Sequence, residues 1–173
     1  MVKKLNLGSG TDHKQGWVNL DHNRRYKAEV YHNLDKFPYP FKNEEFDYIY
    51  CSHVLEHVDD LFKTLKELLR IIKKDGIIHL RVPHFSNGTG YNDLGHKRFF
   101  GWFTFDQMVI EDYYQKNINF KIISKRFNFL SENHKIINFI FSWIFNILPK
   151  RFYERFLCWI FPVGEIEIFL KKN

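Results

Sequence analysis

The chain has 173 residues, a length that suits one domain with a substantial core. Hydrophobic residues make up 45% and charged residues 27% of it, which excludes a disordered composition. The formal net charge of +6 admits an anionic partner, such as a phosphorylated substrate, an anionic membrane or a nucleic acid, without selecting one.

Cysteine usage and the absence of apolar runs predict a protein of the reducing cytoplasm. Cys51 and Cys158 form no CxxC pair, which argues against a disulfide scaffold and against a four-cysteine zinc site. The N-terminus lacks the apolar stretch of a signal peptide, and no apolar run reaches the roughly 18 residues of a membrane-spanning helix. No strand pair interleaves arginine with aromatic residues, so we expect no nucleic-acid partner.

Short apolar strands alternate with helical or loop segments, a pattern typical of an α/β sheet. Helical periodicity runs over residues 59–74, and Lys73–Gly76 should end that helix. A second helix is expected over residues 104–116, after a long loop over residues 83–101 whose aromatic content indicates order. The expected strands cover residues 3–7, 17–20, 29–33, 46–51, 77–82, 120–125 and 165–171.

The first expected strand runs straight into the turn Leu7-Gly8-Ser9-Gly10. Glycine lets the backbone approach a ligand closely, and open α/β sheets bind ligands at the carboxyl ends of their strands. Asp21 ends the next strand, where its carboxylate can accept both hydroxyls of a ribose. The full GxGxxG motif is absent, and no Tyr-x-x-x-Lys pair occurs, so a hydride-transfer enzyme fits poorly.

Five segments follow one another in the order seen in class I S-adenosylmethionine-dependent methyltransferases. These segments are Leu5-Asn6-Leu7-Gly8-Ser9-Gly10, Gly16-Trp17-Val18-Asn19-Leu20-Asp21, Phe37-Pro38-Tyr39-Pro40-Phe41, Glu45-Phe46-Asp47 and Ser52-His53-Val54-Leu55-Glu56-His57. Over roughly residues 3 to 100, the chain resembles the type-11 methyltransferase family, in particular small members linked to cell-surface glycan or lipid biosynthesis. The resemblance implies a Rossmann-like three-layer α/β sandwich, with a mostly parallel seven-stranded sheet whose last strand is antiparallel.

The resemblance also implies that S-adenosylmethionine is the cofactor. Seven residues separate Gly10 from Val18, so the helix that normally follows the glycine turn is vestigial or missing. The N-terminal helices that often cap the pocket are also absent, which leaves acceptor recognition to the C-terminal half. The implied contacts are Gly8, Ser9 and Gly10 at the methionine part, Asp21 at the ribose, Leu34 and Asp35 at the adenine, and Cys51, Ser52 and His53 around the methionine and its methyl group.

Histidines gather where the transferred methyl group should lie. Methyl transfer requires that the acceptor be aligned and lose its proton, and histidine suits proton transfer near neutral pH. We therefore expect His53 and His96 to be catalytic.

A divalent cation is an alternative use of the same cluster. His53, Glu56 and His57, joined by His84 or His96, have the ligand types of such a site. Some RNA-end and quinone methyltransferases carry a similar Glu-x-x-Glu-His arrangement, but here His53 stands in place of the first glutamate. A third reading is structural, with Glu56 hydrogen-bonded at the start of the following helix. The sequence prediction assigns no metal.

An aromatic helical insertion is expected at about residues 131–161 of a single domain that covers residues 1–173. One narrow polar stripe follows an otherwise apolar helix, and Pro149 ends that helix. The helical pair could pack on the sheet or cover the pocket, form a dimer interface, or lie on a membrane beside its basic residues. The stripe consists of Asn138, Ser142, Asn146 and Lys150, and the basic residues are Lys150, Arg151 and Arg155.

The leading prediction is methyl transfer to an oxygen or nitrogen atom of a small-molecule, glycan or lipid-linked acceptor. A second hypothesis is a non-catalytic cofactor-binding or scaffold protein at a membrane, because the region after the glycine turn is shortened. Contact with a membrane surface remains open in both hypotheses, and the sequence does not set the oligomeric state.

Overall fold

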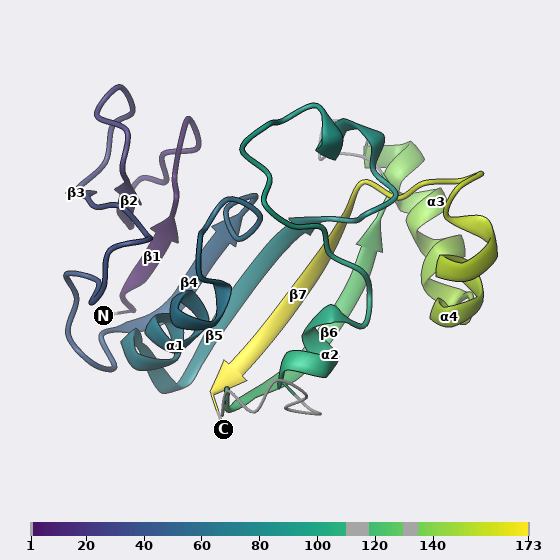
Figure 1. Ribbon diagram of the computed structural model, residues 1–173. Helices are drawn as coiled ribbons and strands as arrows, with labels where there is room; N and C mark the ends of the chain where they lie inside the picture. Colours follow the sequence, from purple (N-terminus) through teal and green to yellow (C-terminus); the bar gives the residue numbers. More distant parts are fainter. Residues whose placement is uncertain (1, 110–117, 130–134, 173) are drawn as a thin grey trace.

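The computed structural model describes residues 2–109, 118–129 and 135–172, which form a seven-stranded sheet (Figure 1). The strand order is β3-β2-β1-β4-β5-β7-β6, and β7 runs antiparallel to both of its neighbours while the other pairs are parallel. This arrangement confirms the predicted Rossmann-like α/β fold. The strands are β1 (Lys4–Leu7), β2 (Val18–Asp21), β3 (Val30–Tyr31), β4 (Phe46–Ser52), β5 (Ile72–Pro83), β6 (Phe120–Asn128) and β7 (Glu165–Lys172).

Loops, and not helices, connect the first three strands of the sheet. No helix occurs in the described residues 8–17 between β1 and β2, or in residues 22–29 between β2 and β3. The prediction that the helix after the glycine turn is vestigial or missing is therefore confirmed.

Helix α1 (Leu61–Ile71) begins at the N-cap Asp60, whose side chain accepts a hydrogen bond from the backbone N–H of Lys63. The sequence predicts a helix through Lys74 and a strand from Ile77, and both boundaries are wrong. The helix ends at Ile71, and β5 begins at Ile72 because this buried residue pairs with Phe46 of β4 across an irregular register.

The loop after β5 contains a short 3₁₀ turn, Gly88–Tyr91, and leads to helix α2 (Thr104–Val109). The predicted continuation of this helix to Lys116 lies outside the described residues. Figure 1 shows α1 and α2 on the same side of the sheet, with the loop over its upper edge.

Side chains alternate between the two faces of β5 and β7, as in any extended strand. Ile78 and Leu80 on β5 join Ile166 and Ile168 on β7 in the same buried core as the inner side of α1. Charged residues of the intervening positions occupy the opposite face, and they form a hydrogen-bonded network. Its members include His79, Arg81, Glu165, Glu167, Arg126 and Asn128.

A hairpin between β6 and β7 consists of α3 (Lys135–Ile147), α4 (Lys150–Phe152) and a π-helical turn, Tyr153–Leu157. The polar stripe of α3 faces β6: Ser142 Oγ accepts from Phe129 N at 2.9 Å. Asn146 accepts from Phe127 N at 2.9 Å and donates to Phe127 O at 2.8 Å. The Asn138 side chain lies outside the described part. None of the described helices has the length and apolarity needed to cross a lipid bilayer.

Candidate functional site

A cavity of about 490 Å³ opens at the carboxyl ends of β1, β2 and β4. This volume falls within the usual range of about 300–1,000 Å³ for small-molecule sites. Of the residues expected at the cofactor, Gly8, Asp21, Leu34, Asp35 and His53 line the cavity. The remaining lining residues are Leu20, His22, Asn33, Val54, His57, Val58, Gly95 and Lys97.

Gly8 of the glycine turn lines the cavity at a point with no room for a side chain. Gly8 has φ +67°, and a Cβ atom built there would lie 2.4 Å from Val54 Cγ2. The backbone N–H groups of Gly8 and Ser9 donate to Leu20 O at 2.8 and 3.0 Å, which holds the turn against β2. Ser9 Oγ is buried without a hydrogen-bond partner among the described residues, and neither Ser9 nor Gly10 lines the cavity.

Asp21 is held rigidly at the end of β2. Its Oδ2 accepts from Gly10 N at 2.7 Å, and its Oδ1 accepts from Asn23 N at 2.8 Å. A carboxylate has about four acceptor positions, so this buried side chain retains capacity for two ribose hydroxyls. The position fits the predicted ribose contact.

The far end of the cavity is built from Asn33, Leu34 and Asp35. Asp35 Oδ1 accepts from Asp59 N at 2.6 Å, which ties this loop to the segment before α1. An apolar side chain beside a fixed carboxylate suits a base with an exocyclic amino group. Together with the glycine turn and Asp21, these residues fit an adenosine-containing cofactor.

The structure places the side chain of Cys51 differently from the prediction. Cys51 is fully buried in the core, and burial raises the pKa of its thiol, so the side chain does not line the cavity. Ser52 is half-buried at the end of β4 and also does not line the cavity.

His53 follows β4 in a left-handed backbone conformation with φ 53°. Its Nε2 lies 3.0 Å from Glu165 Oε2, and its Nδ1 lies 3.4 Å from Glu56 Oε1. The hydrogen bond with Glu165, assisted by Glu56, raises the pKa of His53 to about 9. His53 is therefore an imidazolium at neutral pH, where it donates hydrogen bonds and does not accept a proton.

Sequence reasoning missed Glu165, which holds His53 in this state, and Arg81, which fixes the position of Glu165. The Arg81 guanidinium donates to both oxygens of Glu165, at 2.8 and 2.9 Å, and Glu165 in turn accepts from His53. The available signal was the presence of charged residues at alternate positions of two otherwise apolar strands. Their pairing across β5 and β7 is visible only once the sheet is formed.

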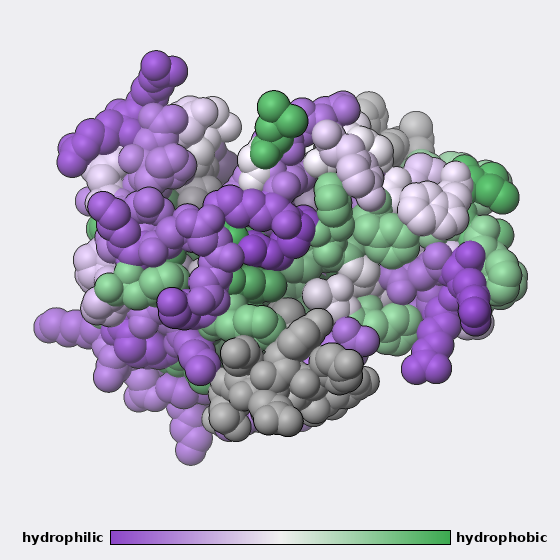
Figure 2. All heavy atoms as spheres, viewed as in Figure 1, coloured by the Kyte–Doolittle hydropathy of each residue, from purple (hydrophilic) through white to green (hydrophobic). Residues whose placement is uncertain are grey.

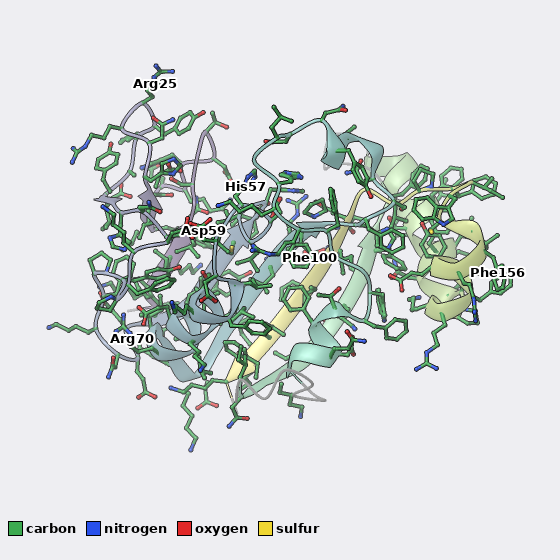
Figure 3. All side chains as sticks on the ribbon, in the orientation of Figure 1. Arg25, His57, Asp59, Arg70, Phe100 and Phe156 are labelled. Carbon is green, nitrogen blue, oxygen red and sulfur yellow. The ribbon has the colours of Figure 1, made fainter. Side chains whose placement is uncertain are left out.

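Of the other histidines considered for a metal cluster, His57 and His96 lie at the cavity and His84 does not. His57 lines the cavity, and its ring contacts that of His96 with centroids 4.7 Å apart (Figure 3 labels His57). His96 lies between two lining residues of the long loop, Gly95 and Lys97. His84 bonds to Ser86 Oγ at 2.7 Å and lies 3.2 Å from Glu154 Oε1, so its predicted place in the cluster is wrong.

His22 is a histidine of the cavity that the sequence predictions did not place there. It is exposed, and it also lines the cavity, with Nδ1 3.7 Å from Asp21 Oδ1. Its position directly after Asp21 was the signal that could have placed it there.

The comparisons with known proteins agree with this geometry. Residues 7–80 match the family described as a methyltransferase domain. No curated protein matches the sequence. A SAM-dependent methyltransferase from Archaeoglobus fulgidus is 18% identical with a TM-score of 0.64, over 99% of this chain and 86% of that chain. A putative methyltransferase from Bacillus halodurans is 17% identical with a TM-score of 0.60, over 99% of this chain and 92% of that chain. At these identities the two structures show a shared fold.

Proposed function

We propose that this S-adenosylmethionine-dependent methyltransferase transfers a methyl group to an oxygen or nitrogen atom of a lipid-linked acceptor at a membrane surface. Gly8, Asp21, Leu34 and Asp35 would hold the cofactor, which supplies a methyl group on a sulfonium when bound. The observation that carries the acceptor class is an apolar surface on the hairpin of residues 135–161.

His53 and the pair His57–His96 form the acceptor end of the cavity. His53 lies at the cavity wall as an imidazolium, so it can donate a hydrogen bond to an acceptor oxygen. His57 also lines the cavity, and its ring contacts that of His96.

The hairpin has its polar side inward and its apolar side outward. Ser142 and Asn146 form hydrogen bonds with the backbone of β6, and Phe145 beside them is buried, whereas the opposite face of α3 is exposed. Figure 2 shows hydrophobic side chains gathered at this end of the molecule, and Figure 3 shows Phe156 on its outer side. The exposed apolar residues are Phe139, Ile140, Phe141, Trp143, Ile144, Ile147, Phe152, Phe156, Trp159, Ile160 and Phe161.

This surface has the composition of an interfacial helix. Such helices combine exposed aromatic and aliphatic side chains with basic residues that attract anionic headgroups. Trp143 and Trp159 are 63% and 68% exposed, and the exposed basic residues Arg151 and Arg155 lie on the same hairpin. The chain carries a net charge of +6, which adds a general attraction to an anionic surface.

The hairpin is physically joined to the loop that reaches the cavity. Glu154 of the hairpin accepts from Trp102 N, and its Oε1 lies 3.2 Å from His84 Nε2. Phe85 and Trp159 also contact each other, with ring centroids 5.5 Å apart. The same loop supplies Gly95 and Lys97 to the cavity, so a hairpin lying on lipid would orient the acceptor end toward the membrane.

Vesicle flotation tests the membrane part of the proposal. The wild-type protein should float with vesicles of phosphatidylglycerol and phosphatidylcholine, and less with phosphatidylcholine alone. Trp143→Ser combined with Trp159→Ser should abolish flotation, whereas Ile123→Ser, at an exposed apolar position of β6, should leave it unchanged. Raised salt should weaken the electrostatic part of the attachment.

A labelled-methyl assay tests the acceptor class. We expect label from S-adenosylmethionine to enter glycolipid and lipid-linked saccharide fractions in preference to the corresponding water-soluble sugars. Transfer to the soluble sugars alone, or full flotation of the double tryptophan variant, would contradict a membrane-presented acceptor.

A further inference from the structure

We propose that Glu56, His57 and His96 bind a divalent transition-metal cation at the wall of the cavity. Each residue offers one ligand atom, and the three atoms lie within 4.8 Å of one another. The inference depends on ligand geometry alone, so it holds whether the acceptor is lipid-linked or soluble.

Glu56 is a buried carboxylate that lies 3.4 Å from His53 Nδ1 but accepts no hydrogen bond from the described residues. Its residue is 0% exposed, and neither oxygen has a hydrogen-bond partner among the described residues. The helix-start role expected from sequence belongs to Asp60, which caps α1. Burial of carboxylate oxygens that accept no hydrogen bond is unfavourable, and a bound cation would offset that cost.

His96 is similarly without a structural purpose. Its Nδ1 is buried with no hydrogen-bond partner among the described residues. Its Nε2 faces Glu56 Oε1 at 4.0 Å and Asp93 Oδ2 at 3.9 Å, both beyond hydrogen-bond length. Ligand atoms about 2.1 Å from a tetrahedral cation lie about 3.4 Å from one another, so His96 needs to approach Glu56 by roughly 0.6 Å.

Hydrogen bonds from the two residues after His96 hold the loop against the segment that contains Glu56 and His57. Lys97 N donates to Glu56 O at 2.8 Å, and the Arg98 guanidinium donates to the carbonyls of Leu55 and Val58 at 2.7 and 2.6 Å. A Cβ atom at Gly95 would lie 3.1 Å from His57 Nδ1. A side chain at this position would press against the ring of His57.

One carboxylate and two imidazoles are the ligand set that suits Zn²⁺, Fe²⁺, Co²⁺ or Mn²⁺, and it disfavours cations that need thiolates. Three protein ligands leave coordination positions for water or an acceptor oxygen. His57 lines the cavity, so an oxygen on the cation would lie at its wall, where the cation would lower the pKa of that oxygen. His53 bonds to Glu165 and stands outside the ligand set.

The test is titration of the tag-free, metal-stripped full chain with Co²⁺, followed by calorimetry and by visible absorption. We expect one saturable site per chain, competition by Zn²⁺, and a rise in thermal stability on binding. The absorption signature of coordinated Co²⁺ in the wild-type protein identifies nitrogen and oxygen ligation without reference to any variant.

Ligand variants locate the site. Loss of a second-shell partner costs about 10- to 100-fold in metal affinity, so Glu56→Gln and His96→Gln should each cost at least as much. His22→Gln, which removes an exposed histidine of the same cavity, should leave Co²⁺ affinity unchanged. Absence of a saturable site in the folded wild type, or equal affinity in folded Glu56→Gln and wild type, would overturn the proposal.

Discussion

At the scale of single residues, Asp21 is already hydrogen-bonded to the backbone that surrounds the cavity. Asp21→Ala should weaken S-adenosylmethionine binding by roughly 1.5–3 kcal/mol, the value of hydrogen bonds to a charged group, or about 10- to 150-fold. Asp21→Asn keeps one acceptor oxygen and should lose less. Calorimetry measures both affinities, and unchanged affinity in Asp21→Ala would remove this residue from the site.

Substitutions at Gly8 and Gly10 distinguish the cost of a positive φ from the cost of a steric contact. Both have positive φ, but a Cβ at Gly8 meets Val54, whereas a Cβ at Gly10 meets nothing within 4 Å. Gly10→Ala should therefore lose only the backbone term, about 1–2 kcal/mol of unfolding free energy. Gly8→Ala should lose clearly more, and adding Val54→Ala should restore part of the difference. Urea unfolding measures all three, and equal losses in the two single variants would contradict the close contact.

Residues at strand ends could be predicted from sequence, whereas partners that are distant in the chain could not. Gly8, Asp21 and Asp35 were placed by the order of motifs, because each motif ends at the same edge of a parallel sheet. Glu165 lies 112 positions from His53, and no local pattern joins them. The protonated state of His53 therefore became visible only in the fold.

At the scale of elements, the charged network on β5, β6 and β7 makes the free energy of unfolding depend on pH. Burial opposes ionisation of Glu167, but hydrogen bonds from His79, Arg126 and Asn128 outweigh it and lower its pKa from 4.5 to about 2. A lowered folded-state pKa stabilises the fold above the unfolded-state value, and this contribution is lost as pH falls from about 4.5 to 2.

The pKa difference corresponds to about 3 kcal/mol over the whole window. Glu167→Gln should therefore be less stable than the wild type at pH 7, and its stability should fall less on acidification. Urea unfolding between pH 7 and 3.5 measures the early part of this window. Glu44→Gln is the control, since its exposed ion pair with Lys172 should contribute little to the same slope. Parallel curves for Glu167→Gln and wild type would refute the coupling.

Element types were predictable, but boundaries set by tertiary contacts were not. Periodicity gave the helix that contains Leu61–Ile71, because its apolar positions repeat along one face. It extended this helix into β5, since Lys73–Gly76 resembles a helix stop and the pairing of Ile72 with Phe46 is not local. The polar stripe on α3 was recognised, but its orientation toward β6 required the structure.

At the scale of the whole molecule, cofactor binding should stabilise the fold. S-adenosylhomocysteine at 100 times its Kd should add about 2.7 kcal/mol, which raises Tm by roughly 5–10 °C for a chain of this size. Asp21→Asn should show a smaller rise at the same concentration. Thermal unfolding with NAD as the comparison ligand completes the test, and a larger rise with NAD would contradict the assigned cofactor.

The mostly parallel seven-stranded sheet and its antiparallel last strand were implied by the resemblance of roughly residues 3 to 100 to a known family. The acceptor end of the cavity could not be predicted from this resemblance, because the long loop and the hairpin form it. Residues such as Gly95 and Trp159 lie in segments whose sequence is compatible with several packings. Their placement depends on contacts with the completed sheet.

The side-chain amide of Asn146 has a further consequence for the sheet. β6 is the last strand in the order, and Asn146 and Ser142 occupy backbone groups of Phe127 and Phe129 that would otherwise await another strand. An open edge is a template for strand addition by a second chain and thus for aggregation. The hairpin therefore covers this end of the edge strand and protects it from pairing with another chain. Deleting the hairpin should expose the backbone groups of this edge and promote aggregation, and it would also remove the apolar surface.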